Sequence, residues 1–336
     1  MSFDSMTGSC IAPRPRESAA PGGFKMLPKR PPRDQRVGFI YAPPYRIQGI
    51  SIGGEQTVVQ IPELGLNFDI GLAPRMSISA PFVALSHGHM DHVAALPYYF
   101  SQRMFLKMVP GTCVCHPELA PHLRMMMQGW IQVENQQTPH VITALAPGEE
   151  LEIKPSVMLR AIEARHTVPS LSYAVIEHRS KLKDEFTGLP QSELRRIRSE
   201  GNEITHTLKV PLVAYTGDTE MNENLVSTPF SEAGVVVTEC TFFDDEHFDR
   251  AKVGKHLHVR HLKELMQSWK AETVIVIHTS RRTHLETARK RMIETLGEDS
   301  ERILFLMDHH RNRIRYEQQE TSLRDEKEAA EGGGNG

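Results

Sequence analysis

The sequence predicts an α/β fold whose buried strands end at a polar site. Short, continuously apolar runs are typical of strands that are covered on both faces. Such runs occur at 82–85, 212–215, 234–238 and 273–277. Each is closely followed by histidine, aspartate or glutamate. Because open α/β sheets bind ligands beyond the ends of their strands, these polar residues are the candidates for a functional site.

The remaining elements follow from periodicity and from Gly or Pro at the boundaries. Short strands are predicted at 37–41, 57–61, 66–70, 112–115, 156–165 and 303–307. Helices are predicted at 93–108, at 117–133 and after His258, where Leu262, Leu265, Met266 and Trp269 form one apolar face. Buried strands therefore alternate with amphipathic helices, as in a layered α/β domain.

The densest group of polar side chains is the stretch His87-Gly-His-Met-Asp-His92, directly after the first buried run. Its spacing fits neither one face of a helix nor one face of a strand, so a tight loop is predicted. Crowded imidazoles and a carboxylate are costly to bury without partners. Zinc is a natural partner for this set of nitrogen and oxygen ligands. The stretch therefore predicts a metal site.

Composition excludes several classes of protein. The chain has 336 residues and a net charge of −3, so any RNA contact must come from local basic patches. No apolar stretch approaches the roughly 20 residues of a membrane span. Four cysteines are too few for a disulfide scaffold and predict a reducing, cytoplasmic location. Cys113 and Cys115 are predicted to face the same side of a strand. They are either thiols packed in the core or ligands of a second metal site.

Three changes of composition divide the chain. Residues 1–35 are rich in Pro, Arg, Ser and Gly, which predicts a disordered extension before a domain at 36–316. Residues 178–209 form a charged insertion with one short helix. Residues 317–336 are charged and then Gly-rich, which predicts a disordered tail.

The string at 87–92 resembles the first motif of the metallo-β-lactamase superfamily. Later strings resemble the ribonuclease Z group, the tRNA 3′-processing endonucleases: Gly217-Asp-Thr219, Glu239-Cys-Thr-Phe242 and His278-Thr-Ser-Arg-Arg282. The resemblance runs from about Gly53 to Met307. It implies an αββα four-layer sandwich, in which two mixed sheets are flanked by helices.

The resemblance also implies a ligand set for two Zn²⁺ ions, with Mn²⁺ or Fe²⁺ as alternatives. One ion would be held by His87, His89 and His166, and the other by Asp91, His92 and His278. Asp218 would bridge them, and Asp69, at the end of an early strand, would support the metal loop from behind.

Further roles are implied for residues outside the ligand set. Asp91 could also accept the proton of the attacking water. Glu239 would orient His256, which would donate a proton to the leaving oxygen, and His258 competes with His256 for that role. Ser280 and Arg282 would contact the phosphate of the substrate.

The predicted function is that of a dinuclear zinc phosphodiesterase that cuts RNA at the 3′ end of precursor tRNA. The alternative is a small-molecule hydrolase for a thioester, a lactone or a nucleotide phosphodiester, and a scaffold that has lost catalysis is a third. The insertion is either a solvated surface or an RNA-binding arm. The candidates for RNA contact on the insertion are Lys181, Lys183, Arg195, Arg196 and Arg198. Whether the protein forms a homodimer stays open.

Overall fold

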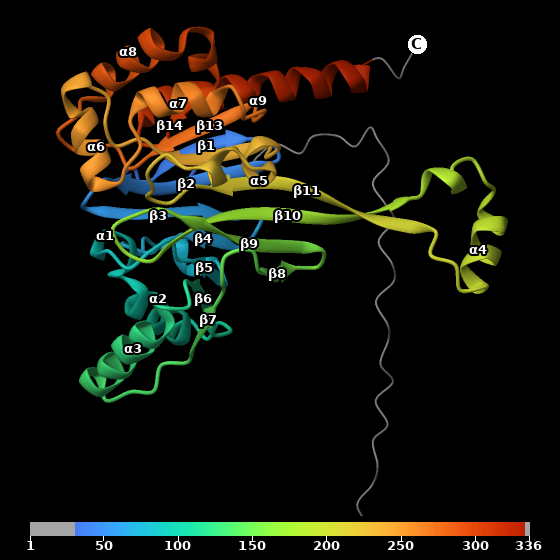
Figure 1. Ribbon diagram of the computed structural model, residues 1–336, viewed down its shortest axis with the longest axis horizontal. Helices are drawn as coiled ribbons and strands as arrows, with labels where there is room; N and C mark the ends of the chain where they lie inside the picture. Colours follow the sequence, from blue (N-terminus) through green and yellow to red (C-terminus); the bar gives the residue numbers. More distant parts are fainter. Residues whose placement is uncertain (1–30, 333–336) are drawn as a thin grey trace, which may run out of the picture. The chain divides into compact units, whose positions relative to one another are not determined.

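The computed structural model describes residues 31–332 and is built on two seven-stranded sheets (Figure 1). The predicted disorder of residues 1–35 falls almost wholly outside the described residues. Within the described part of the chain, no helix is both long and apolar enough to cross a bilayer.

The first sheet is formed by the N-terminal half of the domain. Its strands, in spatial order, are β1 (Gly38–Ala42), β2 (Tyr45–Ile52), β3 (Gln56–Ile61), β4 (Leu66–Phe68), β5 (Phe82–Ala84), β6 (Gly111–Cys115) and β7 (His140–Ala144). β1 to β4 pair antiparallel, and β4 to β7 pair parallel. The sheet is therefore mixed.

The second sheet mirrors the first in its organisation. In spatial order it contains β14 (Ile303–Phe305), β13 (Thr273–Ile277), β12 (Val235–Glu239), β11 (Thr205–Tyr215), β10 (Ser170–Leu182), β9 (Val157–Ala164) and β8 (Glu150–Lys154). β8 to β11 pair antiparallel, and β11 to β14 pair parallel.

Helices cover the outer face of each sheet. The first sheet carries α1 (Met90–Val93), α2 (Leu96–Phe105) and α3 (Ala120–Glu134). The second carries α5 (Thr228–Ser231), α6 (Phe248–Gly254), α7 (Val259–Met266) and α8 (Leu285–Leu296). Short 3₁₀ turns lie at Ser77–Ser79, Asp184–Phe186, Glu223–Val226, Asp245–His247 and Gly297–Arg302.

The alternation of side chains along β11 shows why these layers form. Val213 and Tyr215 pack between the two sheets, whereas Ala214 faces the helices on the outside. Successive strand residues point to opposite faces, so an apolar run supplies two separate cores. The predicted four-layer sandwich is confirmed.

Cys113 and Cys115 lie in the core between the first sheet and its helices, where both are fully buried. Of the two predicted alternatives, core thiols or a second metal site, their surroundings favour core thiols. The hydrogen bond with Cys115 raises the pKa of Cys113, and burial raises it further. The pair serves as packing.

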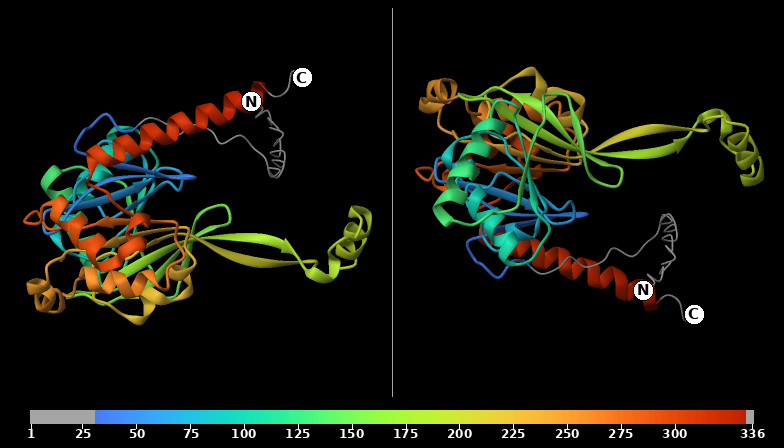
Figure 2. Two further views of the ribbon diagram at one scale, coloured as in Figure 1. Left: turned by 90° about the horizontal axis from the view of Figure 1, so that it is seen from above. Right: turned by 90° about the horizontal axis from the view of Figure 1, so that it is seen from below.

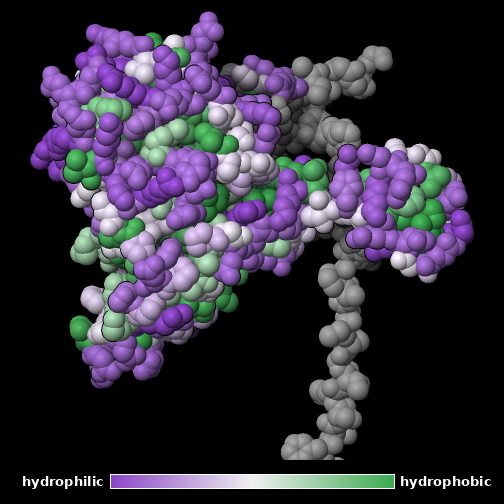
Figure 3. Space-filling view, viewed as in Figure 1, coloured by the Kyte–Doolittle hydropathy of each residue, from purple (hydrophilic) through white to green (hydrophobic). Residues whose placement is uncertain are grey.

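The insertion at 178–209, here called the arm, is a two-stranded ribbon that carries α4 (Gln191–Ser199) at its end (Figures 1 and 2). β10 and β11 stay paired as far as Leu182 and Thr205. The sequence predicted a strand only from Leu212, because the arm residues before it are solvated on both faces and show no apolar alternation. The surface of the arm is mostly hydrophilic, with a small hydrophobic area (Figure 3).

The prediction of a disordered tail at 317–336 is wrong for residues 317–332, which belong to α9 (His309–Gly332), and residues 333–336 lie outside the described residues. The segment is charged, but most of its residues are strong helix formers such as Glu, Lys, Arg, Gln and Ala. A pair one turn apart, between Arg324 and Glu320, adds to this propensity. Charge alone therefore did not distinguish a solvated helix from a disordered tail.

Candidate metal centre

The candidate ligands lie at strand ends of both sheets, where the two sheets meet the same polar space. His87 follows β5, Asp218 follows β11 and His278 follows β13. His278 has a positive φ of 56°, a conformation that costs energy for a residue with a side chain. Gly217 has a φ of 58°, and a Cβ there would lie 2.7 Å from the Cβ of Ser86. Gly217 therefore permits the close approach that brings Asp218 beside the histidines.

The first ligand group consists of His87, His89 and His166. The distance from His89 Nδ1 to His87 Nε2 is 2.9 Å, and that to His166 Nε2 is 3.3 Å. Burial lowers the pKa of His87 and of His166, so both are neutral at pH 7, as a metal ligand must be. The His166 ring is oriented by a hydrogen bond, because its Nδ1 donates to the backbone carbonyl oxygen of Lys255 at 3.0 Å. One ligand atom from each ring faces the same point.

The second ligand group consists of Asp91, His92 and His278. Asp91 Oδ2 lies 3.4 Å from Nε2 of His92 and 3.4 Å from Nε2 of His278. The backbone N–H of Gly54 also donates to this oxygen, at 3.0 Å. Burial opposes ionisation of Asp91, but the adjacent His278 and His92 rings outweigh burial and hold the pKa of Asp91 far below its usual value. The carboxylate is therefore ionised.

Asp218 lies between the two ligand groups. Its Oδ2 is 3.3 Å from Nε2 of His92, 3.2 Å from Nε2 of His278 and 3.9 Å from Nε2 of His87. Among the described residues, the buried atoms Asp218 Oδ1 and His92 Nε2 have no hydrogen-bond partner. Buried polar atoms normally have one. These atoms and their donor set fit divalent metal ions on either side of Asp218.

Asp69 supports both ligand groups from behind. Its Oδ2 accepts a hydrogen bond from His92 Nδ1 at 2.8 Å and another from the hydroxyl of Ser86 at 2.9 Å. Ser86 Oγ in turn lies 2.9 Å from His87 Nδ1, and Tyr215 donates to Asp69 at 2.5 Å. Ser86 and Tyr215 are not among the site residues predicted from the sequence. Only their positions could have indicated a role at the site, because Ser86 begins the His-rich loop and Tyr215 ends a buried strand.

Glu239 and His256 form a hydrogen-bonded pair beside the ligands. His256 Nδ1 lies 3.0 Å from Glu239 Oε1, and Thr241 donates to the other carboxylate oxygen at 2.7 Å. Burial of His256 lowers its pKa, but the negative charge of Glu239 outweighs burial and raises the pKa of His256 to about 9. His256 therefore carries a proton at pH 7.

His258 lies at the N-terminus of α7. Its Nδ1 accepts a hydrogen bond from the backbone N–H of Arg260, and its Nε2 donates to the carbonyl oxygen of Asp244 at 3.0 Å. The side chain is fully buried and caps the helix. Of the two histidines proposed as proton donor, only His256 contacts Glu239.

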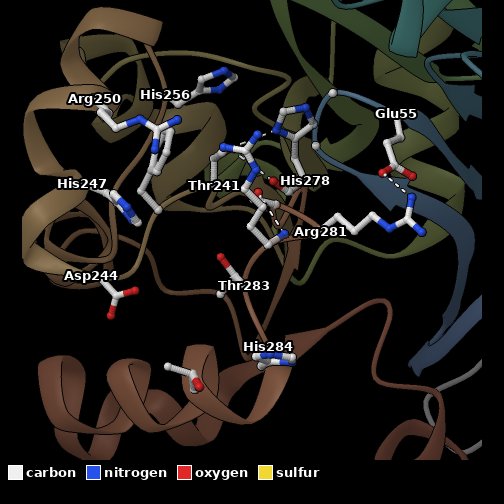
Figure 4. Close-up of a pocket in the computed structure, with 16 residues that line it drawn as sticks. Glu55, Thr241, Asp244, His247, Arg250, His256, His278, Arg281, Thr283 and His284 are labelled. Carbon is white, nitrogen blue, oxygen red and sulfur yellow. Dashed lines mark hydrogen bonds and ion pairs between the residues drawn. The ribbon is translucent and has the colours of Figure 1, made fainter.

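A pocket of about 710 Å³ opens beside His256 and His278 (Figure 4). Both predicted phosphate contacts, Ser280 and Arg282, line it. Arg281 also lines the pocket and pairs with Glu55 at 3.1 Å. Arg282 is exposed, and its backbone N–H donates to the hydroxyl of Ser280. Arg281 and Arg282 would therefore place positive charge beside a substrate phosphate near His278.

Comparison with known proteins identifies the family of the chain. A model of the beta-lactamase superfamily domain matches residues 77–279. The tRNase Z TRZ1 of Arabidopsis thaliana is 32% identical over 241 residues, which cover 71% of this chain and 86% of the relative. The chloroplastic tRNase Z TRZ2 of the same plant is 29% identical over 277 residues, 80% of this chain and 77% of the relative.

A solved structure shows the same fold. The metallo-beta-lactamase fold protein YhfI from Bacillus subtilis is 16% identical, with a TM-score of 0.51 over 80% of this chain and 94% of that one. The chain thus belongs to the metallo-β-lactamase superfamily of metal-dependent hydrolases. Within that superfamily it belongs to the tRNase Z family.

Proposed function

We propose that the protein is a dinuclear zinc endoribonuclease that hydrolyses a phosphodiester near the 3′ end of precursor tRNA. The observation that carries this proposal is the Glu239–His256 pair, which lies beside a complete set of metal ligands. Hydrolysis of RNA releases an alkoxide, which is a poor leaving group and needs a proton. The names of the two plant relatives support tRNA as the substrate.

The two ligand groups would each hold one ion, and Asp218 would contact both. Two divalent ions in such a site lower the pKa of water towards neutrality and neutralise the charge that develops on the phosphate. Asp69 keeps His92 in the tautomer whose Nε2 is free to bind a metal, because His92 Nδ1 donates to it. The mixed nitrogen and oxygen donors favour zinc, with Mn²⁺ or Fe²⁺ as alternatives.

The remaining roles belong to side chains around the phosphate. Asp91, which is ionised, accepts the proton of the attacking water. His256, which is protonated at pH 7, donates to the oxygen that leaves, and Glu239 stabilises the charged form of its ring. Arg282 and Ser280 hold the non-bridging oxygens of the phosphate.

The arm supplies basic contacts for a long substrate. Arg195, Arg196 and Arg198 of α4 are exposed at its end. Arg196 is paired with Glu193 and Glu200, which leaves Arg195 and Arg198 as the better partners for phosphates. Contacts at the arm would add affinity for tRNA without touching the site of hydrolysis.

The direct experiment incubates the purified protein with precursor tRNA that carries a 3′ trailer and maps both new ends. We expect a single cut at the junction with the trailer, abolished by Asp91→Ala. A wild-type protein that hydrolyses a small diester but leaves this RNA intact would favour the alternative, a small-molecule hydrolase. The cytoplasmic location stays a prediction, since one relative is named chloroplastic.

A further inference from the structure

The pocket beside the metal centre extends well beyond the residues needed to hold one phosphate. On one side of His278 it is lined by Glu55 and Arg281, and on the other by His247 and Arg250 (Figure 4). Phe242 belongs to the second group, because it lines the pocket and its ring lies beside His247 and Arg250. The second group combines an aromatic ring, an imidazole and a guanidinium. This combination is typical of surfaces on which nucleobases stack.

The side chain of Phe242 lies at the pocket wall and is not part of the hydrophobic core. Its neighbour Phe243 is 2% exposed and packs among the apolar residues under α7 and α8. Phe242 points the other way and is half-buried at the pocket wall. A parallel bridge to His258 holds its backbone, because the N–H of Val259 donates to the carbonyl oxygen of Phe242 at 3.0 Å. The backbone that carries the ring is therefore held in place at the pocket wall.

An exposed side chain covers one face of the Phe242 ring. The guanidinium of Arg250 lies over the ring at 5.8 Å from its centroid. Arg250 is exposed and can shift to admit a base. The ring of His247 lies at 6.0 Å with a tilt of 58°. A base stacked on Phe242 would thus gain a cation on its outer side.

Phe242 also adjoins the side chain that delivers the proton. Its centroid lies 6.2 Å from that of His256. In hydrolysis the oxygen of water bonds to phosphorus, the bond to the leaving oxygen breaks, and that oxygen takes the proton of His256. The nucleoside that carries the leaving oxygen therefore lies on the same side of the phosphate as His256 and Phe242.

We infer that Phe242, His247 and Arg250 form a subsite for the base of the nucleotide that carries the leaving oxygen. This inference rests on the proposed function, because it assigns one side of the scissile phosphodiester to one side of the pocket. The subsite binds the base by stacking, so it accepts any of the four bases and fixes the sugar beside His256. It positions the leaving oxygen for protonation.

The test measures binding by calorimetry, with the metal-loaded protein and a dinucleotide whose leaving oxygen is replaced by a methylene group. Three forms of this probe are compared: one intact, one abasic on the leaving side and one abasic on the other side. In the wild type, loss of the leaving-side base should weaken binding about 5- to 150-fold, the usual range for one stacked base. In Phe242→Leu the intact and leaving-side abasic probes should bind nearly equally.

Matched variants separate stacking from a general disturbance. Phe242→Tyr keeps the ring and should retain the wild-type ratio between the two probes. Arg250→Ala should reduce that ratio. Phe105→Leu and Arg260→Ala change an exposed Phe and an exposed Arg that do not line the pocket, and both should leave it unchanged.

The inference is overturned if Phe242→Leu keeps the wild-type ratio, or if it lowers the contribution of both bases alike. A failure of the proposed function would look different. The wild type would then leave precursor tRNA intact in the cleavage assay, while the calorimetric ratios would still decide whether Phe242 stacks a base.

Discussion

His256 Nδ1 lies 3.0 Å from the carboxylate of Glu239 and 4.0 Å from Oδ2 of Asp218. The carboxylate is fully buried, and its other oxygen is held by Thr241. A buried charge needs such partners, and the imidazolium of His256 is the one that can give up a proton. The pair therefore makes a positioned acid beside the candidate metal ligands.

Removal of this acid should be selective for the leaving group. His256→Ala should slow cleavage of RNA by about 10²- to 10⁴-fold, the usual contribution of general acid catalysis. Bis(p-nitrophenyl) phosphate should suffer far less, because its phenolate leaves without a proton. Steady-state rates on both substrates provide the check. Equal losses on the two would mean that His256 has a structural role.

The pH profile should report the same group. Since the pKa of His256 is raised to about 9, the acid is present at pH 7 and is lost as the pH rises through about 9. The kcat for RNA should therefore fall above about pH 9. The profile for His256→Ala should lack this descent. A wild-type profile that stays level to pH 10 would contradict the assignment.

Support of the ligands by Asp69 can be tested through metal affinity. The Asp69→Asn side chain has the same shape as aspartate but lacks the negative charge. In the wild type, His92, Ser86 and Tyr215 donate hydrogen bonds to that carboxylate. We expect metal affinity to fall about 10- to 100-fold, measured by competition with a chromophoric chelator. Asp245→Asn, which changes an exposed carboxylate, is the control and should bind metal as the wild type does.

Substitutions in the arm should change the affinity for precursor tRNA but not for a small diester. Arg195→Ala and Arg198→Ala should each raise KM for precursor tRNA and lower the slope of log affinity against log salt by about one. Arg196→Ala should do less, because carboxylates on both sides already pair with Arg196. Rates on a small diester should not change. If all three variants bind tRNA with the wild-type salt slope, the arm does not hold RNA.

The fold and the gathering of the candidate ligands could be predicted from sequence because each group of candidates follows a buried strand. A strand ends shortly before each of the residues His87, Asp218 and His278. In α/β sheets such strand ends lie close together. Ser86 and Tyr215 could not be found this way, since their role depends on contact with Asp69, which Ser86 makes within the first sheet and Tyr215 makes from the second. Their types and neighbours in sequence carry no sign of that contact.

Two other features depended on tertiary context in different ways. The ribbon of the arm is solvated on both faces, so β11 lacks the alternation that reveals a strand before Leu212. His256 and His258 are equivalent in sequence. The folded chain separates them, because one reaches Glu239 and the other caps α7.

The central claim is that two metal ions held by the two ligand groups hydrolyse RNA. The most direct measurement strips the protein with a chelator, confirms by circular dichroism that it stays folded, and adds zinc back stepwise. Elemental analysis and cleavage of precursor tRNA are followed together. We predict two equivalents of zinc per chain, with full cleavage reached only at the second. Full cleavage at one equivalent or with none would contradict the claim.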